Sequence, residues 1–218
     1  MFSDLPEAFC WSKFSSEAGE TPEQILSRKD LERARNGGVF LWGIGSSIAP
    51  SLRLLLGITR SPAIIFTPMI SRPAFEDVHP PAIAHWQSAT GMDGSAYEIP
   101  RHSAVTSRVN SDGSARKHFA LVCFSDTSLT EPGRGSLDDS KLRNLRSGAR
   151  LGASQVTSVV RRVSSSSHGR YSIAIRALLT YPYLISLSDF TLSERLPSIG
   201  HALEDELGQW NWDLRKDA

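Results

Sequence analysis

A well-capped helix between two apolar runs constrains the fold of this chain more than any other feature. Thr21-Pro22-Glu23-Gln24 has the order of a capping box with proline at the first helical position, and Asn36-Gly37-Gly38 ends the helical pattern. The runs Ala8–Phe14 and Val39–Ile44 on either side are short and apolar, which is typical of buried strands. The sequence therefore predicts the order strand, helix, strand.

Within this helix, apolar residues recur at helical spacing and charged residues fill the positions between them. The apolar residues, which we expect to face the core, are Ile25, Leu26, Leu31 and Ala34. The charged residues, which we expect to stay in solvent, are Arg28, Lys29, Glu32, Arg33 and Arg35.

The rest of the chain alternates apolar runs with turn-forming residues. We expect further helices over 50–56, 138–147 and 154–163, and strands over 63–70, 118–124, 171–179 and 183–187. Pro62 and Pro68 indicate that the strand over 63–70 is an edge strand or a bulged one. Residues 71–100 hold four prolines and Trp86, which predicts an irregular excursion with one helical turn over 81–86. A turn is expected at Asn110-Ser111-Asp112-Gly113 and a flexible serine-rich connector over 164–169.

The C-terminal pattern differs from the rest. Ile199, Leu203, Leu207, Trp210 and Leu214 recur at helical spacing with acidic residues on the other positions, which predicts an acidic amphipathic helix. This helix either docks on the body of the protein or serves a protein partner or self-association through residues 198–214. We expect an α+β domain over 1–190, with the helix or tail over 191–218.

Composition limits the class of protein. A chain of 218 residues with 40% hydrophobic content can bury a full core. Its longest apolar runs are far below the roughly 20 residues of a membrane span, and no basic-then-apolar leader opens the sequence, so we expect a cytoplasmic protein that does not engage a membrane. Cys10 and Cys123 lie among apolar residues, which favours buried thiols over a disulfide framework or a reactive cysteine.

The net charge of +1 hides a strong asymmetry. Residues 101–176 hold thirteen Lys and Arg against five Asp and Glu, while the remainder of the chain is acidic. Such a distribution indicates either a surface that faces a polyanion or an arginine-rich solvated face with no partner.

Motifs for catalysis or for a bound group are missing from the sequence. The six histidines form no pair at metal-ligand spacing, and no Gly-x-Ser-x-Gly elbow is present. Gly43-Ile44-Gly45 follows a predicted strand but lacks the third glycine and the lysine of a nucleotide loop. We therefore predict a non-catalytic protein with no cofactor and no metal.

Tryptophans near the expected strand ends offer flat rings that can stack on nucleobases, although Trp11 and Trp42 fit equally well as core residues. The order of the pieces resembles the PUA-like barrels of the EVE and YTH type, which bind modified bases in DNA or RNA. The resemblance covers roughly residues 8–163. It is carried by Trp11-Ser12-Lys13-Phe14-Ser15-Ser16-Glu17, by Gly38–Trp42, by Ile64–Asp77 and by the segments Phe119–Phe124, Leu137–Leu145 and Leu151–Thr157.

This resemblance implies a mixed β-sheet or open barrel flanked by short helices, and a base clamped between aromatic rings beside an arginine-rich surface. The residues expected to bind the base are Trp11, Ser12, Lys13, Ser16, Trp42 and Trp86. The residues expected at phosphates or sugars are Arg143, Asn144, Arg146, Arg150, Gln155, Arg161 and Arg162. Two alternatives stay open: a small hydrolase of modified nucleosides that uses Lys13 and Glu17, and an interaction module that uses the C-terminal helix.

Overall fold

The computed structural model describes residues 5–15, 17, 20–45, 47–69, 82–107, 118–130, 137–152, 155–163 and 175–192. Over these residues the chain is a mixed α/β structure, as predicted, with one large sheet. The helices are α1 (Pro22–Arg35), α2 (Ala49–Ile58) and the short 3-10 helix η1 (Asp139–Lys141). The strands are β1 (Ala8–Phe14), β2 (Val39–Ile44), β3 (Ala63–Pro68), β4 (Ala82–Gly91), β5 (Ala96–Tyr97), β6 (Val105–Ser107), β7 (His118–Phe124), β8 (Leu142–Asn144), β9 (Thr157–Arg162) and β10 (Ile175–Leu192).

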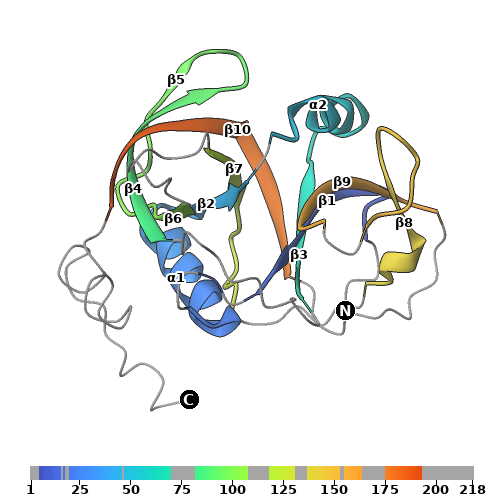
Figure 1. Ribbon diagram of the computed structural model, residues 1–218, viewed down its shortest axis with the longest axis horizontal. Coiled ribbons are helices and arrows are strands. Elements are labelled where there is room, and N and C mark those ends of the chain that lie inside the picture. The colour runs from blue at the N-terminus through green and yellow to red at the C-terminus, as the bar shows by residue number, and fades with distance from the viewer. Residues whose placement is uncertain are drawn as a thin grey trace.

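Seven strands form the sheet in the order β2-β7-β10-β3-β1-β9-β8 (Figure 1). Strand β4 pairs with the C-terminal half of β10, and β5 and β6 pair with β4. Neighbouring strands are antiparallel except for β1 and β3, which run parallel with Cys10 opposite Ile64 and Phe14 opposite Pro68. Because parallel strands end at the same edge of a sheet, the C-terminal ends of β1 and β3, at Phe14 and Pro68, lie side by side.

The longest strand, β10, joins the two halves of the sheet. It pairs with β3 near Ile175, with β7 in its middle and with β4 up to Leu192. The two strands predicted over 171–179 and 183–187 are therefore parts of one strand, with a register shift between Leu179 and Leu184. Buried and exposed side chains alternate at its start, where Ile175 is buried and Arg176 is exposed.

The sheet is strongly curved. Three strands separate β2 from β1, so a flat sheet would hold these two strands about 19 Å apart. The ring of Trp42 on β2 nevertheless lies 4.3 Å from that of Phe66 on β3, and its indole N–H lies 2.9 Å from the Ser12 hydroxyl on β1. The two strands must therefore face each other across a concave side. In the described residues the order still has two ends, at β2 and β8.

Three separate hydrophobic clusters stabilise this sheet. The largest fills the concave side and includes Phe40, Phe66 and Leu121. A second cluster, around Phe9, lies on the outer side of β1 and β9, and a third lies between β4 and the β2–β7 pair. Both faces of the central strands are thus covered, which explains their nearly continuous apolar sequences. Cys10 and Cys123 are free and fully buried, and burial raises the pKa of Cys10 to about 12.

Helix α1 begins as the sequence predicts and docks in a way that the sequence does not. The Thr21 hydroxyl accepts from the Gln24 N–H, and the Gln24 side chain accepts from the Thr21 N–H, which completes the capping box. The predicted inner face is correct for Ile25 and for Leu26, which packs against the main cluster, but Leu31 is only partly buried and Ala34 is exposed. The buried positions are Ile25, Arg28, Lys29 and Glu32.

Paired charges make this burial tolerable. Arg28 donates twice to the Glu20 carboxylate at 2.7 Å, and Lys29 donates to Glu32 at 2.7 Å. Both cations also donate to the carbonyl of Ala104, at 3.1 and 2.6 Å. A buried ion is costly unless it is paired and hydrogen-bonded, and each of these four meets that condition. Helix α1 is therefore fastened to the β6 side of the molecule by polar contacts.

Glu32 has a second role at the edge of the sheet. Its Oε1 accepts the backbone N–H of Leu41 at 2.7 Å, and β2 is an end strand of the described order. Edge strands expose unpaired backbone groups that can recruit another strand, so covering such a group with a helix protects the edge. Figure 1 shows α1 lying alongside this part of the sheet.

Helix α2 is close to its prediction and covers the concave side over β1 and β9. Leu52 and Leu55 are fully buried in the main cluster. Leu54 and Ile58 on its outer side are exposed.

Two predicted helices are wrong. The valines at 156, 159, 160 and 163 have helical spacing, yet residues 157–162 form β9, where Val159 and Val160 enter the clusters on opposite faces of the sheet. Strands suit β-branched residues, and burial of both faces removes the alternation that identifies a half-buried strand. Over 138–147 the acidic start supports only η1, capped by Asp138, before Leu142 begins β8 and packs in the second cluster.

The proline-containing segments also differ from their predictions. Strand β3 is interior, between β10 and β1, because Pro62 precedes it and Pro68 lies beyond the last residue paired with β10, so neither proline interrupts the two-sided ladder. The helical turn predicted over 81–86 is wrong from Ala82 onward, where β4 begins.

Several predictions lie outside the described residues: the turn at 110–113, the connector at 164–169, the first residues of the strand at 171–179, and the C-terminal helix over 198–214. The predicted boundary at 190 falls inside β10, which continues to Leu192. Among the described residues, no helix is long and apolar enough to cross a membrane.

Candidate nucleic-acid interface

The polar centre of the concave side is built around Ser12. Its hydroxyl accepts from Trp42 Nε1–H at 2.9 Å and lies 2.9 Å from the Thr157 hydroxyl, with either oxygen able to donate. Ser12 is fully buried, whereas Thr157 is half-buried. The Trp42 ring packs on Phe66 and meets Phe14 edge-on. The hydrogen bond from Trp42 therefore orients the Ser12 hydroxyl, and the packing of the Trp42 ring leaves little of that ring exposed to solvent.

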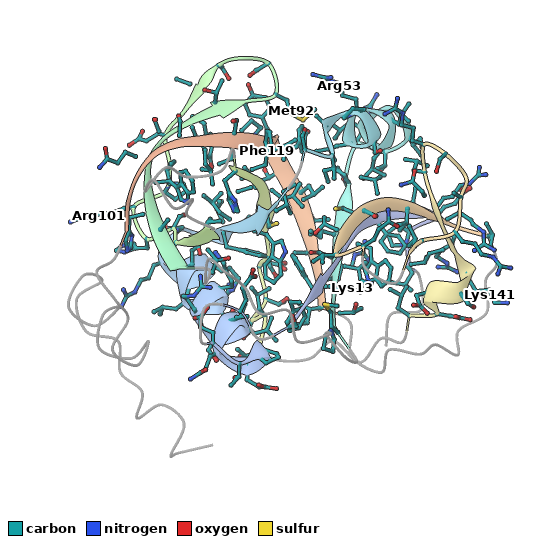
Figure 2. All side chains as sticks on the ribbon, viewed as in Figure 1. Lys13, Arg53, Met92, Arg101, Phe119 and Lys141 are labelled. Carbon is teal, nitrogen blue, oxygen red and sulfur yellow. The ribbon has the colours of Figure 1, made fainter. Side chains whose placement is uncertain are left out.

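Trp11 lies on the other side of β1, in the second cluster. Its indole N–H donates to the Thr67 hydroxyl at 2.9 Å, which links the parallel strands β1 and β3. The Lys13 ammonium lies 5.1 Å from the ring centroid, within the range of a cation–π contact. Lys13 itself is 6% exposed, and Figure 2 shows it on β1 in the middle of the molecule.

Trp86 belongs to the third cluster and is separate from both. Its ring stacks on His118 with a centroid distance of 5.6 Å and an interplanar angle of 11°. Burial lowers the pKa of His118 to about 4, so the imidazole is neutral near pH 7. The structure thus joins Trp11, Ser12, Lys13 and Trp42 through β1 and places Trp86 elsewhere. Ser16 lies outside the described residues.

Lys13 and Glu17, the pair considered for hydrolysis, have different neighbours. Lys13 packs on Trp11, whereas the charge of Glu17 acts on Arg28. Burial alone would lower the pKa of Arg28, but Glu20, Glu32 and Glu17 together raise it. Burial lowers the pKa of Lys29 despite its contact with Glu32. Arg28 and Lys29 are thus held in the buried side of α1 by the neighbouring glutamates.

The predicted basic segment does not form one surface. Arg101 and Lys141 lie on opposite sides of the molecule in Figure 2. The expected phosphate-binding residues are closer together, since β8, the turn after it and β9 carry Arg143, Arg146, Arg150, Arg161 and Arg162. We call β8, β9 and the described residues between them, 145–152 and 155–156, the β8–β9 ribbon.

Some of the expected ribbon residues have structural roles. Asn144 Oδ1 accepts the backbone N–H groups of Arg146 and Ser147, which shapes the turn after β8. Gln155 Oε1 accepts from the Gly152 N–H, and Arg162 donates to the Leu5 carbonyl at 2.7 Å. These three side chains are thus engaged within the protein.

The remaining ribbon arginines are available to a ligand. In the described part of the chain, Arg146, Arg150 and Arg161 form no ion pair and their side chains donate no hydrogen bond, and all three are exposed. Arg143 is half-buried, and toward described residues its side chain donates through Nη1, to the carbonyls of Ser140 and Leu142. Arginines that form no ion pair with a described carboxylate can donate charge-assisted hydrogen bonds to a bound anion.

The ribbon and the Ser12 centre share one face of the sheet. Thr157, Val159 and Arg161 alternate along β9 opposite Ser12, Cys10 and Ala8 of β1, and Val159 and Cys10 lie in the concave cluster. Residues two apart on a strand point to the same face, so Arg161 and Thr157 point alike, about 13 Å apart along the strand.

Sequence reasoning missed Thr157 and Thr67, which complete the hydrogen bonds of Ser12 and Trp11. An interpretation of 154–163 as a strand would have aligned Thr157 with Arg161. Nothing in the sequence marks Thr67 beyond its place at the end of an apolar run. Among the described residues, no three His, Cys, Asp or Glu side chains are grouped to hold a metal ion.

No protein-family model matches this sequence, and no curated protein or solved structure matches it significantly.

Proposed function

We propose that this protein binds nucleic acid without catalysing a reaction on it. The observation that carries the proposal is the shared face of β9, where Arg161, which forms no ion pair with a described carboxylate, points the same way as the half-buried Thr157 hydroxyl, about 13 Å along the strand. Exposed cations bind the phosphate backbone, and an accessible hydroxyl can contact a sugar or a base edge.

In this proposal the contact to a base, including a modified one, is made by the half-buried Thr157 hydroxyl. Each tryptophan ring already packs on another side chain: Trp11 on Lys13, Trp42 on Phe66 and Trp86 on His118. Trp42 therefore positions Ser12, and Ser12 positions the half-buried Thr157. The resemblance to the PUA-like EVE and YTH domains remains part of the proposal, supported by the strand, helix, strand order of β1, α1 and β2 and by the curved sheet.

The test is a binding titration with labelled DNA and RNA oligonucleotides, single-stranded and duplex, with and without base modifications, at several salt concentrations. We expect binding at low salt that weakens linearly on a log–log plot as salt rises, because phosphate binding releases counterions. Absence of binding at low salt, or binding with no salt dependence, would overturn the proposal. A higher affinity for one modified oligonucleotide would identify the base that the Thr157 hydroxyl contacts.

A further inference from the structure

Three arginines of the β8–β9 ribbon come together from different points of the chain. We propose that Arg143, Arg150 and Arg161 form a single binding site for one phosphate group. This inference rests on the proposed function only for the source of the phosphate. That source is either an internal phosphodiester of a nucleic acid or a terminal phosphomonoester.

Strand register brings the three side chains together. Arg143 lies directly opposite Arg161 on one side and forms an isolated bridge with Arg150 on the other. Directly opposed residues of antiparallel strands point to the same face with their Cβ atoms about 5 Å apart. The Arg161 guanidinium also leans over the turn after β8, where its Nη2 is 3.9 Å from the place a Cβ on Gly148 would take. The three form a row on one face.

Such a row is unfavourable by itself. Like charges placed directly opposite one another on a sheet repel, and no described carboxylate forms an ion pair with any of these three side chains. Asp138, which precedes β8 in the sequence, uses Oδ1 to accept from the N–H and the hydroxyl of Ser140. An anion held among the guanidinium groups removes the repulsion, so the arrangement suits a ligand that carries negative charge.

The geometry of guanidinium suits an oxyanion that accepts bidentate hydrogen bonds, and phosphate is the oxyanion of the nucleic acid proposed above. Arg143 has five N–H groups, and the hydrogen bonds of Nη1 to Ser140 and Leu142 fix its plane while Nε and Nη2 stay available. Planar forks of this kind match the tetrahedral oxygens of phosphate in bidentate pairs, which single lysines do not. Three cations around one group favour a dianionic monoester over a monoanionic diester.

Matched controls are built into the ribbon. Arg146 is equally exposed and lies in the same turn, but it is not opposed to any member of the row. The side chains of Arg150 and Arg161 make no hydrogen bond with any residue in the described ranges, so replacing them leaves the backbone pairing of the ribbon in place. The informative variants are thus Arg150→Gln and Arg161→Gln, with Arg146→Gln as the control.

The first experiment measures inorganic phosphate binding to the full chain by calorimetry. Loss of one charged hydrogen-bond donor should weaken affinity about tenfold or more in Arg150→Gln and Arg161→Gln, with a change of less than about twofold in Arg146→Gln. Equal affinity in all three variants would overturn the site, even if the protein binds oligonucleotides. Phosphate binding that depends on the row, in a protein that binds no oligonucleotide, would support the site and overturn the proposed function.

The second experiment compares oligonucleotides of one sequence with a 5′-phosphate or a 5′-hydroxyl end. Tighter binding of the phosphorylated end, lost in Arg161→Gln, assigns the site to a terminal monoester. Equal binding of both ends, weakened to the same degree in Arg161→Gln, assigns it to a backbone diester. Binding of both that is unchanged in Arg161→Gln contradicts the site.

Discussion

The indole N–H of Trp42 donates a hydrogen bond to the Ser12 hydroxyl at 2.9 Å, across a sheet in which three strands separate the two residues. This hydrogen bond joins β2 to β1 over the concave side. The same Ser12 hydroxyl is also hydrogen-bonded to the Thr157 hydroxyl of β9. One fully buried hydroxyl therefore connects the curvature of the sheet with the position of the β8–β9 ribbon.

Replacing Ser12 should reveal this connection. In Ser12→Ala, the buried Trp42 N–H loses its acceptor, which should lower the free energy of unfolding by about 1–3 kcal/mol. Urea denaturation measures the change. Ser61→Ala, at an exposed serine, is the control and should stay within about 0.5 kcal/mol of the wild type. A neutral Ser12→Ala would mean that the hydrogen bond does not hold the curved sheet.

The buried charges of α1 predict strong coupling between Lys29 and Glu32. Lys29→Met leaves a buried carboxylate with one partner fewer and Glu32→Gln leaves a buried ammonium, so each should cost about 3–5 kcal/mol. The double variant should cost clearly less than the sum of the two. Denaturant unfolding of the four proteins gives the coupling.

The control for this cycle is the Arg33–Asp30 pair on the same helix, which is more exposed. Arg33→Gln should cost less than about 1 kcal/mol. Additive effects of Lys29→Met and Glu32→Gln would contradict a shared network.

His118 predicts a specific loss of stability in acid. Burial lowers its pKa to about 4 in the folded protein, against about 6.5 when unfolded, so the unfolded chain binds the proton more readily. Stability from the neutral imidazole is complete above pH 6.5 and is lost as pH falls toward 4, by up to about 3 kcal/mol. His118→Phe keeps a ring against Trp86 and should flatten this part of the pH profile. Parallel profiles of the variant and the wild type would exclude His118 as the cause.

Two glycines predict opposite effects of the same substitution. A Cβ on Gly43 would overlap Val105 Cγ1 and lie 3.1 Å from His118 Nε2, so Gly43→Ala should destabilise by about 1–3 kcal/mol. A Cβ on Gly57, inside α2, meets nothing within 4 Å, so Gly57→Ala should stabilise by about 0.5–1 kcal/mol. Melting temperatures of the pair measure both. Similar shifts in the two variants would contradict the close packing of β2 against β6.

The parts of the fold that the sequence predicts correctly are those with strong local signals. The Thr21 capping box and the proline after it specify where α1 begins, and Ala8–Phe14, Val39–Ile44 and His118–Phe124 are strands at the predicted residues. In each case propensity, pattern and flanking turns agree, which is the condition under which local sequence specifies structure.

The failures arise where tertiary contacts outweigh local pattern. Arg28 and Lys29 look like solvent residues because the backbone carbonyl against which they are buried, that of Ala104, is more than 70 positions away in the sequence. Val159 and Val160 look helical because both faces of β9 are buried. Trp11, Trp42 and Trp86 lie in separate clusters because of the order of the strands in the sheet. Local sequence patterns do not indicate that order.

The same limit applies to the site. The sequence indicates arginines, but only the register of β8 with β9 shows that Arg143 and Arg161 are opposed. The pairing of Ser12 with Thr157 likewise joins residues 145 positions apart.

The most direct test of the central claim is the salt dependence of oligonucleotide affinity in the wild type and in Arg161→Gln. We predict binding that weakens with salt, and a log–log slope that is smaller by about 1 in the variant, because one phosphate contact is lost. Identical slopes in the two proteins, or no binding by the wild type at low salt, would contradict nucleic-acid binding through this face of β9.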